Sequence, residues 1–386
     1  MKSQAALLTE TGLAKPYAQS KPLRIETLDL APPNDEEVVV KVLAAGLCHS
    51  DLSVIDGSRP RPLPMVLGHE GVGEIVAFGS DYTGNPKTGI CAGLSVGDRV
   101  VFAFVPSCGY CEYCAQGRPS LCETGAKSNA AGELAGGGKR WKNGNGEPTC
   151  HHLGISAFAD VVIVSARSLV RVDKSLPVEV AAVFGCAVLT GVGAVLNTAK
   201  VSAGQSVAIF GLGGIGLAAL LGAKAAGANP ILAVDVQPQK LALAQKLGAT
   251  NTFRSDLPGD LVAGIKSVTN GGVDFAFETV GSERVLGDAY AATRRGGTTV
   301  TVGLPHPEKM LSIPAVSLVA EERTLKGSYM GSAVPSRDIP RYIELYKAGQ
   351  LPVDKLISHR ITLDDINVGF DRLAAGTAVR QVVLFP

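Results

Sequence analysis

The sequence predicts an α/β fold in which strand-rich segments precede and follow a doubly wound parallel sheet. Apolar strands and helices alternate between residues 206 and 302, which is the pattern of a parallel sheet covered by helices. Valine-rich runs bounded by glycine lie before that region, and one more strand pattern closes the chain. We therefore expect three segments, at 1–187, 188–327 and 328–386.

The first segment is predicted to be rich in short strands. Its β-branched runs are separated by glycine and proline, which is typical of strands and turns. The stretches Asp81–Leu94 and Thr124–Cys150 have no periodicity and are expected to be loops. Strands are expected over Glu37–Val42, 71–79, 96–102 and within Leu153–Val172.

The second segment follows a helix of small residues expected over Pro177–Lys200. Its strands are expected at Ser206–Phe210, Ile231–Val234, Gly272–Glu278 and Thr298–Val302, and its helices at Leu217–Ala226 and Gln237–Leu247. In the third segment the pattern changes to a helix at Ile339–Ala348 and a strand at Val379–Phe385. That last strand is expected to return to the first segment.

The bulk composition argues against nucleic acid and membrane as partners. The formal net charge is +1, and 46% of the residues are hydrophobic. No apolar run approaches the ~20 residues of a membrane span, and the first residues contain no signal-peptide core. We expect a cytoplasmic protein with a small-molecule substrate.

Four cysteines within fifteen residues predict a metal site. Zinc takes four thiolates in a closed tetrahedron, and short spacings let one loop present several of them. An Fe–S cluster or disulfides remain alternatives for the same pattern. The four are Cys108, Cys111, Cys114 and Cys122.

A second set of soft ligands is dispersed along the chain. Cys48 lies in C-H-S-D, His69 and Glu70 in G-H-E-G, and Cys186 in F-G-C-A-V-L-T-G. Catalytic zinc is held by such dispersed Cys₂His sets, which leave one position open. Taken singly, each is more often a core cysteine or a structural histidine. A predicted nucleotide-binding motif follows these residues in the sequence, and it strengthens the interpretation of the set as a catalytic zinc site.

A G-x-G-x-x-G pattern follows a predicted strand and opens a predicted helix, which is the context of a dinucleotide site. Asp235 ends the next strand, where a carboxylate accepts hydrogen bonds from ribose hydroxyls and repels a 2′-phosphate. We therefore predict NAD as the cofactor, with Lys240 near the ribose. The loop glycines are Gly211, Gly213, Gly214 and Gly216.

These motifs together resemble the zinc-dependent alcohol dehydrogenases of the medium-chain dehydrogenase/reductase superfamily, over nearly the whole chain. The strings that carry the resemblance are G-L-C-H-S-D, G-H-E-G-V-G-E-I-V, the four-cysteine loop, G-C-A-V-L-T-G, G-L-G-G-I-G and V-R-Q-V-V-L. The resemblance implies a GroES-like β-rich catalytic domain over 1–187, a Rossmann domain over 188–327, and a return segment over 328–386. It also implies a homodimer or homotetramer.

Residue roles follow from the resemblance. Asp51 would hold the ring of His69, and Ser50 would pass on the substrate proton. The implied ligands of two zinc ions per chain are Cys48, His69, Cys186 and, occasionally, Glu70 at the catalytic ion, and Cys108, Cys111, Cys114 and Cys122 at the structural ion. The implied cofactor contacts are His49, Thr190 and Arg380, and the implied pocket residues are Phe104, His152, Leu153, Leu304 and Tyr329.

Two features depart from the family pattern. Ser53 stands where well-studied members place a histidine of the proton relay. Arg59 and Arg61 stand where the glutathione-dependent formaldehyde dehydrogenases carry two acids, which disfavours that substrate. Ordinary exposed cations remain an alternative for both arginines. A further metal bound by the neighbouring His151 and His152 is disfavoured, since no cysteine or acid spacing supports it.

The predicted activity is reversible hydride transfer between NAD and a primary alcohol or aldehyde, including bulky or aromatic ones. A polyol dehydrogenase is disfavoured because Cys186 stands where those enzymes commonly use a carboxylate. A non-catalytic NAD-binding protein is disfavoured because the three catalytic-zinc ligands are intact.

Overall fold

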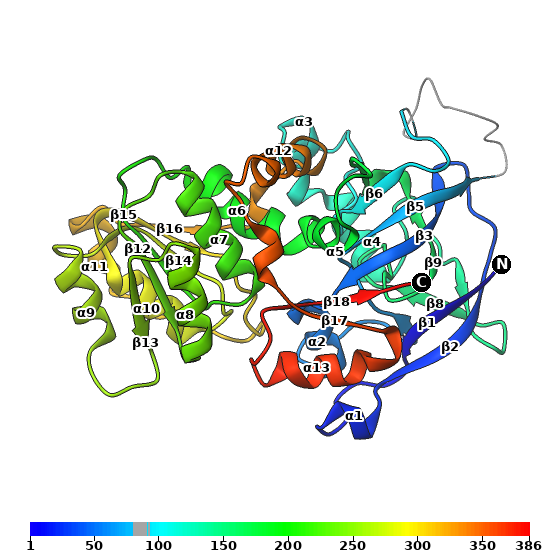
Figure 1. The fold of residues 1–386 in the computed structure, drawn as a ribbon, viewed down its shortest axis with the longest axis horizontal. Coiled ribbons are helices and arrows are strands. Elements are labelled where there is room, and N and C mark those ends of the chain that lie inside the picture. The colour runs from blue at the N-terminus through cyan, green and yellow to red at the C-terminus, as the bar shows by residue number, and fades with distance from the viewer. Residues whose placement is uncertain (80–90, 92) are drawn as a thin grey trace. The chain divides into compact units, whose positions relative to one another are not determined.

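The computed structural model describes residues 1–79, 91 and 93–386, which divide into two compact units. Unit 1 comprises Met1–Cys186, Val334–Pro340 and Ile357–Pro386, and unit 2 comprises Ala187–Ala333 and Arg341–Leu356. Most of the predicted loop Asp81–Leu94 lies outside the described residues. Figure 1 shows the element order along the chain.

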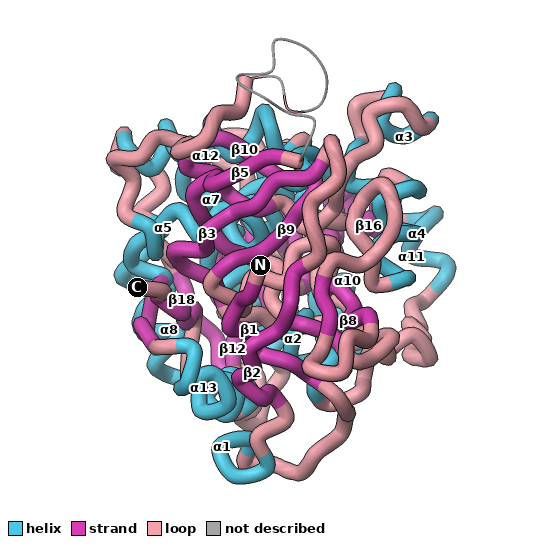
Figure 2. The backbone as a smooth tube through the Cα atoms, turned by 90° about the vertical axis from the view of Figure 1, so that its right-hand side faces the viewer, coloured by secondary structure: helices cyan, strands magenta, loops and turns pink. Residues whose placement is uncertain are grey.

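Unit 1 is built mainly from β-strands, as Figure 2 shows in magenta. Its closed barrel has the order β1 (Lys2–Leu8), β2 (Leu23–Leu30), β7 (Trp141–Lys142), β8 (Pro148–His151) and β4 (Met65–Val66). Its larger sheet has the order β10 (Leu169–Arg171), β6 (Arg99–Phe102), β5 (Gly71–Phe78), β3 (Glu37–Gly46), β18 (Arg380–Leu384) and β17 (Ile357–Ile361), and β9 (Val161–Ser165) also pairs with β3.

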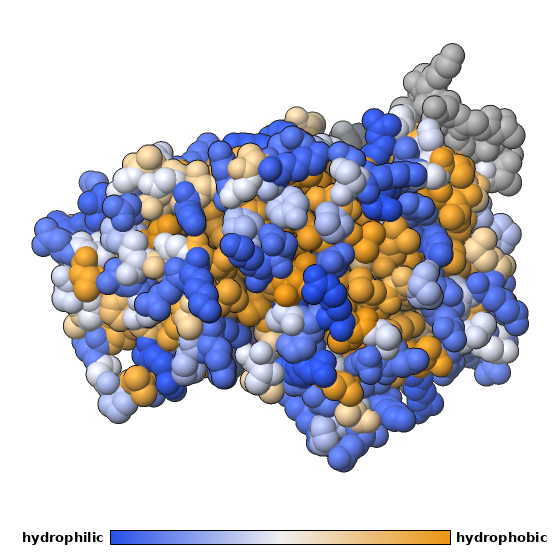
Figure 3. Space-filling view, viewed as in Figure 1, coloured by the Kyte–Doolittle hydropathy of each residue, from blue (hydrophilic) through white to orange (hydrophobic). Residues whose placement is uncertain are grey.

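The C-terminal strand completes this sheet. β18 pairs antiparallel with β3, with Val383 opposite Ala45, so the last strand returns to the β-rich unit as the sequence predicted. β3 is almost entirely buried, so other parts of the protein cover both of its faces. In Figure 3, hydrophobic side chains gather over β3 and β18, whereas hydrophilic side chains gather over α1 (Tyr17–Ser20).

Unit 1 also contains short helices, of which α1 has been named above. The remaining ones are α2 (His49–Ile55), α3 (Glu112–Ala115), α4 (Glu123–Ala131), α5 (Val178–Ala182) and α13 (Ile366–Ala374). The prediction of a loop over Thr124–Cys150 was wrong, because this range contains most of α4, all of β7 and most of β8. α4 escaped detection because it buries only Gly125 and Asn129, which give no apolar period. The Cys122 side chain, which accepts from the Gly125 amide, starts this helix.

Unit 2 contains the predicted parallel sheet. Its order is β13 (Asn251–Arg254), β12 (Ile231–Asp235), β11 (Val207–Phe210), β14 (Val273–Glu278), β15 (Thr293–Thr301) and β16 (Thr324–Gly327), and every neighbouring pair is parallel. The order reverses direction between β11 and β14, which is the switch point where open α/β sheets bind their ligands.

Unit 2 also contains helices. They are α6 (Leu189–Gly193), α7 (Gly214–Ala225), α8 (Pro238–Leu247), α9 (Leu261–Val268), α10 (Glu283–Ala292) and α11 (Ala315–Ala320), and α12 (Pro335–Lys347) begins in unit 1 and ends in unit 2. Of these helices, α7, α8 and α10 contact the strands. α7 contacts α8, and α9 contacts α10, so two helix layers flank the strands. Ile265 and Ala289 from the second layer join the core around Phe210 and Val234.

The predicted helix Pro177–Lys200 is present with two interruptions. Wider π-helical turns occupy Phe184–Val188 and Ala194–Ala199, on either side of α6. The span Val178–Ala199 is long and apolar enough to cross a membrane, but 89% of its most apolar window is buried in the protein. Such burial is the behaviour of a core helix. π-turns often mark functional positions, and the first one contains Cys186.

Candidate functional site

The four clustered cysteines converge in the loop around α3. Their Sγ atoms all lie within 4.8 Å of one another, and those of Cys111 and Cys122 are 3.9 Å apart. A tetrahedral zinc with Zn–S bonds of about 2.3 Å requires S···S separations of roughly 3.8 Å. All eight cysteines, each within the described residues, are free thiols. The donor set and its spacing therefore fit a closed zinc site.

Backbone amides point at these sulfurs. The amides of Cys108 and Gly125 donate to Cys122 Sγ at 3.2 and 3.3 Å, and the Cys111 amide donates to Cys108 Sγ at 3.3 Å. Burial raises the pKa of Cys108, but amide hydrogen bonds from Tyr110 and Cys111 outweigh it and lower that pKa to about 6. Cys108 thus favours the thiolate, which is the form that binds a metal, whereas burial raises the pKa of Cys122 and raises the pKa of Cys114 to about 12.

The dispersed ligand set also converges. Cys48 lies just before α2, His69 precedes β5, and Cys186 lies in the first π-turn, all within unit 1. Their ligand atoms lie within 4.8 Å of one another, and all three residues are buried. Cys186 Sγ is 3.5 Å from His69 Nε2, close to the roughly 3.6 Å separation set by Zn–S and Zn–N bonds in a tetrahedron.

The electrostatics of this set favour a thiolate. A hydrogen bond from the Cys186 thiol lowers the pKa of Cys48, and the positive charges of His69 and Arg380 act in the same direction against burial. These interactions favour the thiolate form of Cys48. Two sulfurs and one imidazole nitrogen form the three-ligand set of a catalytic zinc.

Asp51 links this ligand set to its surroundings. Its Oδ1 atom lies 3.1 Å from His69 Nδ1 and accepts from the Gly68 amide at 3.1 Å, and Oδ2 accepts from the Cys48 amide at 3.2 Å. Burial raises the pKa of Asp51, but the two neighbouring histidines, His69 and His152, outweigh it and hold that pKa well below its usual value. The carboxylate therefore fixes the His69 tautomer with Nε2 as the metal-facing nitrogen.

His152 contacts the same carboxylate. It was expected in the pocket wall, and its Nδ1 atom lies 2.9 Å from Asp51 Oδ1. Its ring contacts that of His69 edge-on, with centroids 5.4 Å apart. Burial lowers the pKa of His152, and the Arg61 charge adds to this, so the ring is neutral. His152 is therefore a second imidazole against the same carboxylate.

Glu70 and Arg380 form a buried ion pair behind the ligand set. Glu70 Oε2 lies 3.0 Å from Arg380 Nη1, which also donates to the Leu47 carbonyl at 2.8 Å. The carboxylate packs over Gly46, where a Cβ atom would approach Oε2 to 2.8 Å. Glu70 is not in the group of converging ligand atoms found among the described residues. Its occasional ligation, and the Arg380–phosphate contact, stay predictions.

Helix α2 carries the residues predicted to handle the proton and the phosphates. Ser50 Oγ lies 3.9 Å from Cys48 Sγ. The Ser53 hydroxyl donates to the His49 carbonyl at 2.8 Å, so its proton is engaged within the helix. His49 is exposed at the first turn.

Phe104 lies in the wall next to the ligand set. Its ring contacts His69 edge-on at 5.3 Å, and its carbonyl accepts from the Asn129 side chain at 2.9 Å. Arg61 Nη1 donates to the Asn129 carbonyl at 3.3 Å, which connects this arginine to the same wall. Leu153, also buried, begins the turn after β8. Arg59 is partly exposed in the segment after α2.

In unit 2, the glycine loop joins β11 to α7. Gly211 has a φ of 91°, and a Cβ atom there would approach Val280 to 2.6 Å. At Gly216 a Cβ atom would lie 1.8 Å from the Gly211 carbonyl oxygen, whereas at Gly213 it would meet nothing within 4 Å. The loop is thus tight on the strand side and open where a pyrophosphate would approach the amides that begin α7.

Asp235 lies at the carboxyl end of β12, beside this loop. Its Oδ2 atom accepts from the Leu212 amide at 2.6 Å, and Oδ1 accepts from the Gln237 amide at 2.8 Å. Both oxygens keep lone pairs for ribose hydroxyls. The remaining predicted residues of unit 2 are Thr190, which is buried in α6, Lys240, which is partly buried in α8, and Leu304 and Tyr329, which are exposed.

The sequence analysis missed Glu278, which is buried at the carboxyl end of β14. Its Oε1 atom accepts from the amides of Val280 and Gly281 at 2.7 and 2.6 Å, and Oε2 accepts from Thr301 at 3.0 Å. The loop that it holds places Thr279 Oγ1 2.9 Å from the Gly211 carbonyl. The available signal was an acid at the end of a buried strand, in the region of the predicted glycine loop.

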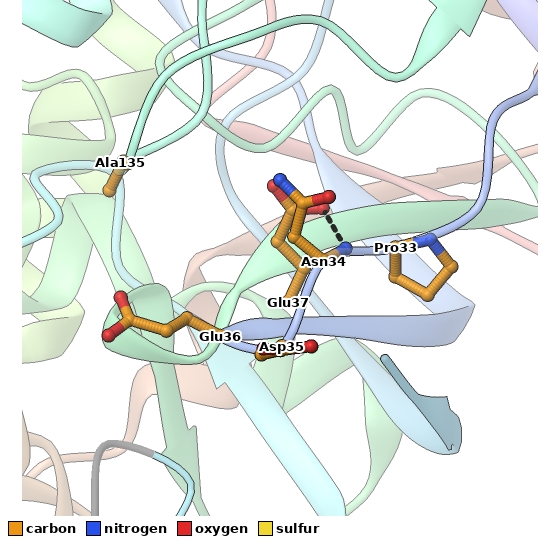
Figure 4. Close-up of a pocket in the computed structure, with 7 residues that line it drawn as sticks. Pro33, Asn34, Asp35, Glu36, Glu37 and Ala135 are labelled. Carbon is orange, nitrogen blue, oxygen red and sulfur yellow. Dashed lines mark hydrogen bonds between the residues drawn. The ribbon is translucent and has the colours of Figure 1, made fainter. Parts of the chain in front are cut away.

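A surface pocket of about 390 Å³ lies elsewhere in unit 1, between the segment 33–37 and the turn at Ala135 and Gly136. Figure 4 shows its acidic lining, with the Asn34 amide donating to Glu37. The Glu37 carboxylate also accepts from Arg140 at 2.6 and 2.8 Å. Because these contacts tie adjoining loops together, we interpret the pocket as structural.

Comparison with known proteins agrees with this geometry. Residues 34–174 match the alcohol dehydrogenase GroES-like domain, and residues 214–348 match the zinc-binding dehydrogenase domain. The chain is 37% identical to the geraniol dehydrogenase of Castellaniella defragrans, over 99% of this chain and 98% of that protein. It is 35% identical to the class-3 alcohol dehydrogenase of Drosophila melanogaster, over 96% of each.

A solved structure is similar over its whole length. The crystal structure of benzyl alcohol dehydrogenase from Acinetobacter calcoaceticus matches with a TM-score of 0.90 and 33% identity, covering 100% of both chains. Together these matches confirm the predicted fold class, a GroES-like β-rich domain with a Rossmann parallel sheet.

Proposed function

The chain belongs to the zinc-dependent alcohol dehydrogenases, and on that premise we propose that it interconverts bulky or aromatic primary alcohols and their aldehydes with NAD. The reaction class and the use of zinc and a nicotinamide cofactor come with the family. The substrate size, the preference for NAD, the residue roles and the number of zinc ions are our proposals. The convergence of Cys48, His69 and Cys186 is the observation that carries the catalytic roles.

We propose that these three residues would hold the catalytic zinc. When bound there, zinc supplies Lewis acidity that lowers the pKa of an alcohol hydroxyl. Asp51 keeps the His69 ring in one tautomer and one orientation, since it contacts Nδ1. Burial of all three ligands excludes water from the reacting centre, which strengthens these interactions.

The substrate proton would leave through Ser50. It is the hydroxyl nearest the ligand set on α2, and it is partly exposed, so it can connect the buried centre to solvent. Ser53 is a poor next step because its hydroxyl already donates to the His49 carbonyl. We therefore propose that the relay continues through the cofactor ribose, with Thr190 close to the nicotinamide and His49 and Arg380 close to the phosphates.

The preference for NAD rests on Asp235. Its carboxylate would accept from the ribose hydroxyls and repel a 2′-phosphate. Lys240, in the first turn of α8, is proposed to contact the ribose as well. Asp235→Gly should narrow or invert the preference, as measured by kcat/KM for NAD and NADP.

The substrate proposal rests on the wall residues and on the relatives. Phe104 and Leu153 are apolar, and Leu304 and Tyr329 are proposed to complete the pocket. Ser50 is smaller than the threonine common in the family, which leaves room beside the zinc. Relatives named for geraniol and benzyl alcohol fit this size class. A panel of ethanol, geraniol and benzyl alcohol should give the lowest kcat/KM for ethanol, and the reverse order would contradict the proposal.

The alternative enzymatic function is that of a glutathione-dependent formaldehyde dehydrogenase. Arg59 and Arg61 place positive charge where that substrate's free amine needs acids. If Arg61 borders the pocket, ω-hydroxy acids should be favoured over uncharged alcohols, modestly, because exposed charge pairs contribute only about 0–1 kcal/mol. The preference should shrink at high salt and in Arg59→Ala/Arg61→Ala. Turnover of S-hydroxymethylglutathione above that of benzyl alcohol would favour this alternative.

We propose two zinc ions per chain, one in each cysteine set. Elemental analysis of carefully prepared protein should find close to two. Cys48→Ala and Cys186→Ala should abolish turnover while NAD binding, followed by fluorescence, remains. One zinc or none in the wild type would contradict the assignment.

We also propose a homo-oligomer in the cytoplasm. β16 lies at one edge of the unit 2 sheet, and among the described residues it pairs only with β15. Apolar side chains of Met310, Val316 and Val319 are exposed nearby in sequence. A second copy can pair with such an edge about a twofold axis. The eight free thiols suit a reducing compartment.

A further inference from the structure

Arg254 lies beside Asp235 at the carboxyl edge of the unit 2 sheet. The two residues end β13 and β12, and they are direct partners in the parallel register. The Ser255 amide donates to the Asp235 carbonyl at 3.3 Å, which holds the two strand ends together. Side chains alternate between the faces of a strand, so partners in register project from the same face. Arg254 and Asp235 therefore leave the sheet on one side.

The glycine loop fixes what lies on that side. Asp235 contacts the Leu212 amide of the loop, and α7 begins two residues later at Gly214. A dinucleotide held by this loop places its adenosine ribose at Asp235. The guanidinium of Arg254 is consequently adjacent to the ribose 2′ position, which is the only place where NAD and NADP differ.

Arg254 is already engaged by a carboxylate. Its Nε atom donates to Asp256 Oδ1 at 2.8 Å, and its Nη2 atom contacts Asp256 Oδ2. This two-pronged contact uses the same face of the guanidinium that binds a phosphate. The two side chains are 33% and 39% exposed, so the pair is weak enough for a phosphate to compete with Asp256.

We propose that Arg254 is a 2′-phosphate-binding group that Asp256 keeps engaged, so that Asp235 and Asp256 together set the cofactor preference. The inference rests on the proposed preference for NAD. Asp235 repels the 2′-phosphate directly, and Asp256 keeps engaged the cation that is the register partner of Asp235. Removing Asp256 alone has little effect, because Asp235 still repels the phosphate and becomes available to pair with Arg254.

The test is a double-mutant cycle on the zinc-loaded protein. Dissociation constants for NAD and NADP are measured by titration calorimetry in the wild type, Asp235→Ser, Asp256→Ala and the double variant. We expect Asp256→Ala to leave NADP binding within about twofold of wild type, and Asp235→Ser to tighten it. Adding Asp256→Ala to Asp235→Ser should tighten NADP by a further three- to fivefold, the scale of an exposed charge pair. NAD binding should be unchanged by Asp256→Ala.

Arg254→Ala in the double variant is the decisive control. It should remove the additional gain for NADP and leave NAD binding unchanged. If it weakened both cofactors equally, Arg254 would act on a group common to both, and the proposal would be wrong. Strict additivity of the two acidic substitutions would also overturn it. Equal binding of both cofactors by the wild type would instead refute the proposed preference, and coupling in the cycle would still support the assignment of Arg254.

Discussion

His152 shares the Asp51 carboxylate with the proposed zinc ligand His69. It packs edge-on against the His69 ring, and its Nδ1 atom lies 2.9 Å from Asp51 Oδ1. A carboxylate that bonds to His69 and two backbone amides and also lies against a second imidazole has little freedom to rotate, so the His69 ring is fixed more firmly. We therefore treat His152 as a positioning residue for the metal rather than only as part of the pocket wall.

Replacing His152 tests this role. His152→Phe keeps an aromatic ring and removes the nitrogen, so release of the catalytic zinc to a chelator should accelerate about 10- to 100-fold. His152→Asn keeps a donor near the Nδ1 position and should restore most of the wild-type rate. Release of the zinc at the four-cysteine site serves as the internal control and should not change. Equal acceleration by both variants would mean that only packing is lost.

For single residues, the sequence indicated candidate metal ligands better than it indicated which side chains contact one another. Cys48, His69 and Cys186 could be recognised because each lies in a distinctive string, and the structure brings their ligand atoms together. The His152–Asp51 contact could not be predicted, because it joins the residue after β8 to α2, far apart in the sequence, and no local pattern encodes it. Glu278 was missed for the same reason: its function is to hold backbone amides of a loop.

The loop around α3 is an element whose shape depends on its sulfurs. α3 has only four residues, and the loop is held by amide–sulfur hydrogen bonds and by Arg167, which donates to the Cys108 carbonyl at 2.6 Å. Such a segment has little apolar core of its own, so metal binding contributes directly to its folding free energy. Removing one sulfur should therefore unfold the loop locally.

We predict that Cys114→Ser lowers the zinc content by one ion per chain and lowers the melting temperature by several degrees, because stability of a few kcal/mol is lost. Limited proteolysis should then cut near α3 first. Cys150→Ala is the matched control: this buried cysteine lies in β8, outside both ligand sets, and its loss should leave two zinc ions bound. Full zinc content in Cys114→Ser would contradict a four-thiolate site.

Helices and strands could be predicted where their burial gives the sequence a recognisable hydrophobic pattern. β11, β12 and β14, which are largely buried, were located from their apolar runs. β13 and β16, which have no fully buried residue, were not predicted, and neither were α9, α10 and α11. α4 was not, since it is short and buries a glycine and an asparagine. The π-helical turn at Cys186 could not be predicted from the sequence either. An extra residue in a helical turn leaves composition unchanged and re-aims a single side chain.

At the scale of the whole molecule, the free edge of the unit 2 sheet is the feature that most needs a partner. β16 is largely exposed along Thr324–Gly327, and α11 precedes it with Val316 and Val319 exposed at 71% and 81%. These two valines are three residues apart and lie on one face of the helix. Exposed edge strands with apolar neighbours tend to pair with another chain.

A second copy is the occupant that fits this edge best, because a twofold axis lets β16 pair antiparallel with itself while the two α11 helices bury each other's valines. Val319→Glu places like charges across that axis and should shift the protein toward a single chain in light scattering coupled to size exclusion. Val268→Glu, which alters an exposed valine at the end of α9, should leave the oligomer intact. Circular dichroism should match the wild type in both variants, since neither valine is buried. If Val319→Glu kept the wild-type mass over a hundredfold dilution, the contact between copies would have to lie on another surface.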